Sequence, residues 1–177
     1  MANTDGSLVV NDTISNRDGS NTTNGVEFLQ FSDKTIFVEN NDNANIARLY
    51  SAAFDRAPDL PGLSFWEDVY SRSISSAAKS AGYYVALAQT NTGSGGSIAA
   101  GFMQSSEFQN KYGALNDSAF VNLLYQNVLG RAPDQAGLDF WVNQLGPAHQ
   151  TREVVLVGFA ESPENVAKTS ADWLVLA

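Results

Sequence analysis

The chain contains one stretch of sequence twice, and this duplication constrains its fold more than any other feature. Residues 46–66 read IARLYSAAFDRAPDLPGLSFW, and residues 121–141 read VNLLYQNVLGRAPDQAGLDFW. At the constant offset of 75, 10 of the 21 aligned positions are identical, where ordinary residue usage would give about one or two by chance. The chain is therefore expected to fold around two copies of one structural unit.

A shorter repetition follows each copy. Residues 98–108 (IAAGFMQSSEF) and 155–165 (VLVGFAESPEN) share a Gly-Phe pair, a serine and a glutamate, now at an offset of 57. The first copy therefore carries 18 extra residues, since 75 minus 57 is 18. Together with the longer stretches, these shorter repeated segments define repeats that span residues 46–108 and 121–165.

Both copies begin with the apolar spacing of an amphipathic helix. Ile46, Leu49 and Tyr50 lie at i, i+3 and i+4, and the second copy repeats the pattern. The sequence RAPD, at 56–59 and 131–134, breaks the helix, and its aspartate is placed to cap the next one. Each copy is predicted to form a helix, a tight corner and a second helix. The repeated Gly-Phe pair is expected to belong to a third helix.

Residues near the helix ends predict how these helices are capped. Asn45 is placed to cap the first helix, and Asn116 or Asp117 to cap its counterpart in the second copy. Gly130 stands where a left-handed helix end is expected.

The extra residues of the first copy lie between Trp66 and Ile98. They are expected to add a helix that contains Tyr83 and Tyr84, followed by a flexible loop at 91–97. The paired tyrosines form a contact patch on one interpretation and part of a local lid over the core on the other.

The first 45 residues have a different character. They are polar and rich in turn residues, and two short β-prone runs, 26–31 and 35–38, flank a polar break. This pattern predicts a β-hairpin. The predicted fold class is thus mainly α: a duplicated helical domain at 46–177, including the C-terminal tail, with a small N-terminal β-hairpin at 1–45.

The segment NRDGSNTTNGVEFLQFSDKTIFV resembles the stretch that closes a calcium-binding β-roll in secreted RTX-type bacterial proteins. It departs from that pattern because it contains no complete G-G-x-G-x-D repeat. Asp18 and Asn21 are therefore open to two interpretations, as part of a calcium site or as residues of a hydrogen-bonded polar turn. Asp42 has the same two interpretations. Calcium is the one cofactor that the sequence suggests.

The charge of the chain limits its partners. There are 19 Asp and Glu residues against 10 Lys and Arg residues, which gives a net charge of −9. Such a surface repels phosphate backbones, so nucleic acid is not an expected partner. There is no cysteine, which excludes disulfides and thiolate chemistry, and no apolar run is long enough for a transmembrane segment.

No arrangement typical of an enzyme is found. His149 is the only histidine and lies in a polar stretch. Carboxylate pairs such as Glu67/Asp68 and Asp134/Asp139 are candidates for acid–base work, but their spacing does not show that they converge, and a solvated face explains them with fewer assumptions. We therefore assign no catalytic residues and no cofactor-binding residues, leave metal ligands unassigned, and expect a protein that is not an enzyme.

The recurring residues are better explained by structure. In each RAPD corner, proline sets the turn, aspartate caps a helix, and arginine is expected to bind carbonyls or a carboxylate nearby. The pairs Phe65-Trp66 and Phe140-Trp141 are expected to face a shared core. The alternative for an exposed tryptophan here is a sugar-stacking platform.

The two ends of the sequence suggest export. MANTDGSLVV lacks the basic and apolar regions of a cleavable signal peptide. KTSADWLVLA, residues 168–177, resembles the uncleaved C-terminal signals of type I secretion, although a docked C-terminal strand or helix explains it as well. The expected location is therefore secreted or at the cell surface.

The motif LYxxxxxRAPDxxGLxFW, present in both copies, is similar to that of a bacterial domain family of unknown function found in RTX-type, surface-layer and other large secreted proteins. The resemblance covers residues 46–170. It implies a largely helical domain in a secreted or surface-bound protein, with no established catalytic residues to carry over. The function that we expect is a non-catalytic extracellular module for self-assembly or attachment at the bacterial surface, as a homo-oligomer or surface assembly. The alternative is a calcium-dependent or glycan-binding adhesin domain; a glycoside hydrolase-like fragment is the enzyme alternative.

Overall fold

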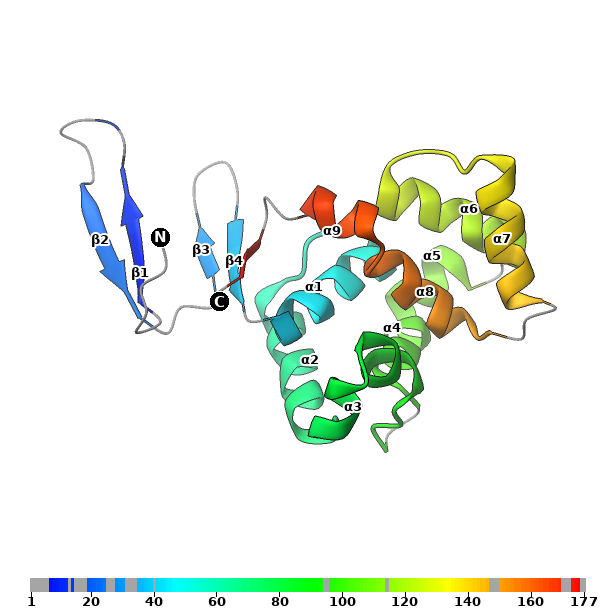
Figure 1. Ribbon diagram of the computed structural model, residues 1–177, viewed down its shortest axis with the longest axis horizontal. Coiled ribbons are helices and arrows are strands. Elements are labelled where there is room, and N and C mark those ends of the chain that lie inside the picture. The colour runs from blue at the N-terminus through cyan, green and yellow to red at the C-terminus, as the bar shows by residue number, and fades with distance from the viewer. Residues whose placement is uncertain are drawn as a thin grey trace. The chain divides into compact units, whose positions relative to one another are not determined.

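The chain folds into a strand-rich unit and a helical unit, which are described separately. The computed structural model describes residues 7–12, 14, 19–24, 28–30, 35–39, 41–93, 96–113, 115–146, 150–169 and 173–175. Unit 1 comprises Met1–Ala44 and Ser170–Ala177, and unit 2 comprises Asn45–Thr169. Figure 1 shows the strands and helices with their labels.

Unit 1 contains two small sheets. Strand β1 (Leu8–Asn11) pairs antiparallel with β2 (Ser20–Thr23). Strand β3 (Phe28–Gln30) pairs antiparallel with β4 (Thr35–Glu39), which pairs in parallel with β5 (Trp173–Val175). The hairpin expected in this part of the sequence is therefore confirmed as β3–β4.

The β1–β2 hairpin was not predicted from the sequence. Its first strand, LVVN, is short, and its second, SNTT, has no apolar residue to reveal a strand period. The pairing is defined by the backbone ladder, in which Val10 lies opposite Asn21. A polar edge strand of this kind carries almost no sequence signal.

The helices recur in the same order in the two copies. The helices of the first copy are α1 (Asn41–Phe54), α2 (Leu60–Ser73), α4 (Ile98–Gln104) and α5 (Ser106–Tyr112). Those of the second are α6 (Asp117–Leu124) with its π-helical continuation η2 (Tyr125–Leu129), α7 (Gln135–Leu145), α8 (Arg152–Ala160) and α9 (Pro163–Thr169). The fold is mainly α with a small N-terminal β-region, as the sequence predicts.

The aspartates of the two RAPD corners cap the helices that follow them. Asp59 accepts a hydrogen bond from the backbone N–H of Gly62 at 2.9 Å, and Asp134 accepts one from Gly137 at 2.7 Å. These bonds satisfy donors at the start of α2 and α7 that have no partner within the helix. The predicted caps are confirmed.

The cap expected at Asn45 is wrong, because α1 already begins at Asn41. The polar run before the amphipathic pattern forms an extra helical turn, so Asn45 lies inside the helix and accepts a hydrogen bond from Arg48. In the second copy, Asn116 is the cap of α6 and accepts from the backbone of Ala119 at 2.9 Å.

The core lies where α4 and α8, the helices with the Gly-Phe pairs, pack against each other. Phe102 of α4 is 0% exposed and Phe159 of α8 is 1% exposed. The other residues of α8 from Val155 to Ala160 are buried too. Because each copy contributes its third helix to this shared core, the two copies form one structural unit.

The extra residues of the first copy form two short elements in place of the single helix expected. These are α3 (Ser76–Ser80) and the π-helix η1 (Tyr84–Gln89). Helix η1 packs against both α4 and α8 and buries Ala86 and Leu87. The insertion in the first copy is therefore packed against the second copy as well.

The first helix of each copy ends in a left-handed residue. Gly130 has φ = 70°, as its position predicts, and the equivalent residue of the first copy, Asp55, has φ = 54°. A Cβ is disfavoured in this conformation, although aspartate tolerates it better than most residues. The same turn thus carries backbone strain in one copy and none in the other.

Replacing Asp55 by glycine is expected to raise the free energy of unfolding by about 0.5–1 kcal/mol, because glycine adopts a positive φ without strain. Gly130→Ala is expected to lower it by about 1–2 kcal/mol. Urea titrations of the two variants and the wild type measure both changes. A shift of both midpoints in the same direction would show that backbone strain does not decide the stability of these turns.

Candidate functional site

The two RAPD corners contain the same ion pair. Arg56 donates to both carboxylate oxygens of Glu107, at 2.8 and 2.9 Å, and Arg131 does the same with Glu164, at 2.8 Å for each bond. The planar guanidinium matches a carboxylate in this two-bond geometry. Each corner is thereby tied to the fourth helix of its own copy, α5 or α9, and we call these contacts the corner clamps.

A lysine of the same helix reinforces each clamp. Lys111 of α5 donates to the carbonyl oxygen of Phe54 at 2.6 Å, and Lys168 of α9 donates to that of Val128 at 2.9 Å. Both carbonyls lie at the end of the first helix, where carbonyl groups lack helical partners and cations are favoured. The lysines are 57 residues apart, the same offset as the glutamates.

In the first copy, the clamp extends into a hydrogen-bonded group. The hydroxyl of Tyr50 donates to Asp59 at 2.7 Å and accepts from Arg56 at 3.0 Å. The bond from Tyr50, followed by the cap bond from Gly62, lowers the pKa of Asp59 to about 2. Arg56 also lowers the pKa of Glu107. Both carboxyls are thus held ionised, which suits an ion pair better than proton transfer near neutral pH.

These pKa shifts predict that the fold loses stability in acid. Because the pKa of Asp59 is lower in the folded than in the unfolded chain, its contribution is present above about pH 4 and is lost as the pH falls towards about 2. The side chain is 52% exposed, so we expect the contribution to be about 1 kcal/mol or less. Thermal melts between about pH 5 and pH 2.5 measure the loss.

Asp59→Asn is the matched variant for this prediction, because asparagine keeps the helix cap and removes the titrating group. Its melting temperature is expected to fall less steeply with acid than that of the wild type. Equal slopes for the two proteins would show that Asp59 does not contribute to the acid response.

Beside each clamp, a tryptophan of the second helix lies against a glycine of the third. A Cβ on Gly101 would overlap the ring of Trp66, and one on Gly158 would lie 2.8 Å from the ring of Trp141. Each indole also packs on the phenylalanine that follows the glycine, with ring centroids 4.4 and 4.8 Å apart. The glycines recur because the indoles approach the helix backbone closely.

The prediction that Phe65 and Phe140 face the core with their tryptophans is wrong. Phe65 is 57% exposed and Phe140 is 55% exposed, whereas Trp66 and Trp141 are half-buried. Neighbouring residues of an α-helix point about 100° apart, and here the tryptophan side lies against the third helix while the phenylalanine side lies in solvent. Two large aromatic side chains therefore stand on the surface at equivalent positions of the two copies.

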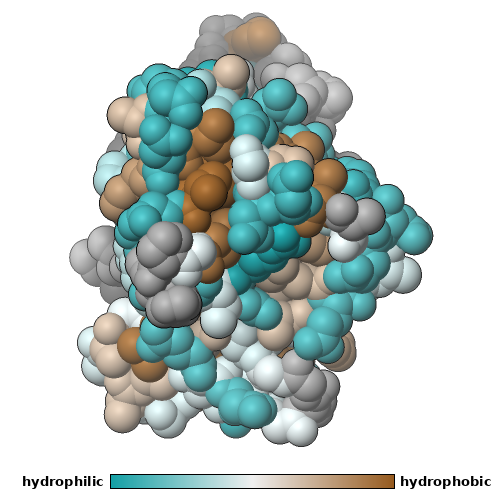
Figure 2. All heavy atoms as spheres, turned by 90° about the vertical axis from the view of Figure 1, so that its right-hand side faces the viewer, coloured by the Kyte–Doolittle hydropathy of each residue, from teal (hydrophilic) through white to brown (hydrophobic). Residues whose placement is uncertain are grey.

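Each exposed phenylalanine lines a groove. The first groove, of about 360 Å³, is lined by residues that include Phe65, Trp66, Arg72 and Gly101. The second groove, of about 290 Å³, is lined by Val154, Val155 and the six residues Tyr84, Gln89, Phe140, Trp141, Gln144 and Gln150. In the side view of Figure 2, hydrophobic residues gather in a patch bordered by hydrophilic ones.

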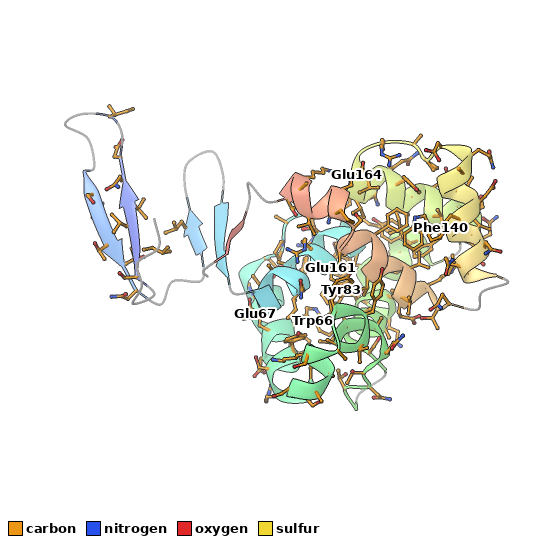
Figure 3. All side chains as sticks on the ribbon, viewed as in Figure 1. Trp66, Glu67, Tyr83, Phe140, Glu161 and Glu164 are labelled. Carbon is orange, nitrogen blue, oxygen red and sulfur yellow. The ribbon has the colours of Figure 1, made fainter. Side chains whose placement is uncertain are left out.

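A buried ion pair joins the two copies. Arg48 of α1 donates to both oxygens of Glu161, at the end of α8, at 2.9 and 2.7 Å. The side chains are only 11% and 4% exposed, and Figure 3 shows Glu161 among the packed helices. Burial raises the pKa of Glu161, and Arg48 opposes this rise. The equivalent positions hold Leu123 and Gln104, so this pair occurs once.

Three of the four carboxylates that the sequence offered for acid–base chemistry make local contacts within or at the start of a helix. Asp68 pairs with Arg72 one turn further along α2. Asp134 caps α7, and Asp139 accepts a hydrogen bond from Gln135 at 2.8 Å.

The other residues singled out from the sequence are only partly described. Asp18 and His149 lie outside the described residues, as does the side chain of Asp42, while Asn21 is exposed on β2. Within the described ranges, no three His, Cys, Asp or Glu side chains are grouped so that they could hold a metal ion. None of the helices in the described part of the chain is both long and apolar enough to cross a membrane.

The clamps, the indole–glycine contacts and the shared core define a duplicated helical module. Residues 99–169 match the family described as "Domain of unknown function (DUF4214)". The matched region runs from α4 to α9 and thus includes the whole second copy. Searches of the curated proteins and of the solved structures found no match to the chain.

Proposed function

We propose that the chain is a non-catalytic extracellular module that mediates self-assembly or attachment at the bacterial surface, of the filament or surface-layer type. The observation that carries this proposal is the exposure of Phe65 and Phe140 at the same place in both copies. Exposed aromatic side chains beside a groove are typical of contact surfaces. The fold itself does not need them there, because the neighbouring tryptophans fill the space against the third helices.

The other recurring residues support a non-catalytic role, because their contacts are structural. The arginines and glutamates form the clamps, the aspartates cap helices, and the glycines admit the indoles. A glycoside hydrolase needs two carboxylates across its cleft, and the described residues that line the two grooves include no carboxylate.

A secreted or cell-surface location is proposed from the sequence. Its motif resembles that of domains in RTX-type and surface-layer proteins, and the family match at 99–169 fits a domain family of unknown function. The acidic charge and the lack of cysteine are compatible with this location.

Light scattering coupled to size exclusion tests self-assembly. The purified chain is measured first in chelator and then in millimolar calcium, and growth into large particles is the expected result. A monomer in both conditions would reject self-assembly and leave attachment to be tested with ligands.

A second candidate function is a calcium-dependent or glycan-binding adhesin domain. The lining of the second groove favours the glycan over calcium, because it offers aromatic rings and neutral amides and no carboxylate. Calcium dependence is decided by comparing the two light-scattering conditions.

A further inference from the structure

The second groove is built from three helices that are far apart in the sequence. Trp141 of α7 and Tyr84 of η1 meet at Gly158 of α8, where a Cβ would lie 2.8 Å from the indole and 3.1 Å from the tyrosine hydroxyl. Phe140 stands beside Trp141, with ring centroids 5.2 Å apart and planes at 78°. Figure 3 shows Phe140 on α7. Phe140 and Tyr84 are 55% and 37% exposed, so the groove presents aromatic surface to solvent.

Three glutamines supply the polar part of the lining. They are Gln89, Gln144 and Gln150. The backbone N–H of Gln150 donates to the carbonyl oxygen of Gln144 at 2.8 Å, which fixes the rim where α7 ends. None of the three side-chain amides is recorded in a hydrogen bond to a residue that the structure describes. Each amide offers two donors and one acceptor.

Among the residues that the structure describes, the lining contains no ionisable acid or base apart from the tyrosine. An anionic ligand would find no cation here and would be repelled by a chain of net charge −9. A cation would find no carboxylate. The ligand that fits is neutral, has an apolar face for the rings and has hydroxyl groups for the amides.

A pyranose ring has these properties, because its C–H groups form an apolar face and its hydroxyls form a polar rim. We propose that the second groove binds a neutral saccharide chain, with Phe140 and Tyr84 against the sugar face and the glutamine amides on its hydroxyls. The volume of about 290 Å³ lies just below the usual range for ligand pockets, roughly 300–1,000 Å³, so the groove holds only part of a chain. This inference deepens the attachment role and rests on it.

The first groove provides an internal comparison. It has the equivalent Phe65 and Trp66, but its lining includes Arg72, which pairs with Asp68. Tyr84 and Gln89 belong to the insertion, which occurs once and packs on α8. The insertion of the first copy thus completes the groove of the second, and the two grooves differ in their lining.

The test is isothermal titration of the purified chain with three neutral oligosaccharides: maltohexaose, cellohexaose and chitohexaose. We expect at least one of them to bind, and Phe140→Ala to weaken its binding about tenfold or more. Phe65→Ala, the matched variant in the first copy, is expected to bind as the wild type does. Because both phenylalanines are exposed, circular dichroism is expected to show both variants folded.

Two results would overturn the assignment. The first is that none of the three oligosaccharides binds, including the case in which an acidic polysaccharide such as polygalacturonate binds instead. The second is that Phe140→Ala binds as tightly as Phe65→Ala. Light scattering on the same samples tests self-assembly independently of saccharide binding. If the chain binds saccharide but stays monomeric, self-assembly is rejected and the saccharide site is retained. Loss of self-association in Phe140→Ala, without saccharide binding, would assign the groove to a second copy of the chain.

Discussion

Replacing Arg48 by methionine is expected to lower the free energy of unfolding by about 3–5 kcal/mol, because it leaves the carboxylate of Glu161 buried without its partner. Glu161 is 4% exposed and receives two hydrogen bonds from Arg48. Methionine fills much of the same volume, so the loss reports the charge rather than a cavity. Urea unfolding at neutral pH measures it.

The loss of stability in Arg48→Met is expected to depend on pH. Burial already raises the pKa of Glu161, and removal of Arg48 takes away the group that opposes this rise. A carboxyl whose pKa is raised on folding favours the folded state at low pH, and this contribution is lost as the pH rises through the folded pKa. The loss of stability in Arg48→Met is therefore expected to become smaller as the pH is lowered from neutral towards the pKa of the Glu161 carboxyl in the unfolded chain.

Two variants control for other effects of the substitution. Arg72→Met removes an exposed ion pair of the same type and is expected to change the free energy by about 0.5 kcal/mol or less. The double variant Arg48→Met/Glu161→Leu removes both charges and is expected to recover most of the loss. An Arg48→Met variant that is no less stable than Arg72→Met would show that the buried pair does not hold the two copies together.

Replacing Phe102 by alanine is expected to lower the free energy of unfolding by about 3–5 kcal/mol. Its ring is 0% exposed and touches three others: those of Trp66, Phe54 and Tyr50, at centroid distances of 4.4, 5.4 and 5.5 Å. Alanine would leave a cavity that this close-packed cluster cannot fill. Thermal and urea unfolding measure the loss.

The equivalent and the exposed phenylalanines provide the controls. Phe159→Ala is expected to cost a similar amount, because Phe159 is 1% exposed and contacts Tyr125 and Trp141. Phe65→Ala is expected to change the free energy by about 0.5 kcal/mol or less, since its ring is 57% exposed. A large loss at Phe65, or a small one at Phe102, would contradict the described division between core and surface.

Much of the helical fold could be predicted from the sequence, because the duplication repeats each local signal. The RAPD caps and the left-handed position of Gly130 follow from residue type alone. The partners of the corner arginines also left a signal. Glu107 and Glu164 recur at the offset of 57, so both ends of each clamp are repeated in the sequence.

The remaining features depend on tertiary packing, which sequence spacing does not encode. Arg48 and Glu161 are 113 residues apart and have no equivalent pair in the other copy. The Phe-Trp pairs were assigned to one face because both residues are apolar, although only the tryptophans lie against the third helices. The second groove could not be predicted, since it needs the insertion of one copy to pack against the other.

The central claim is that the recurring phenylalanines contact partners or ligands, whereas the other recurring residues stabilise the fold. The double variant Phe65→Ala/Phe140→Ala tests this claim most directly. Its thermal midpoint, its particle mass in calcium and its binding to the three oligosaccharides are measured on one preparation. We expect an unchanged midpoint together with loss of particle growth, of saccharide binding or of both. A midpoint that falls as far as that of Phe102→Ala, or survival of both kinds of contact, would contradict this division.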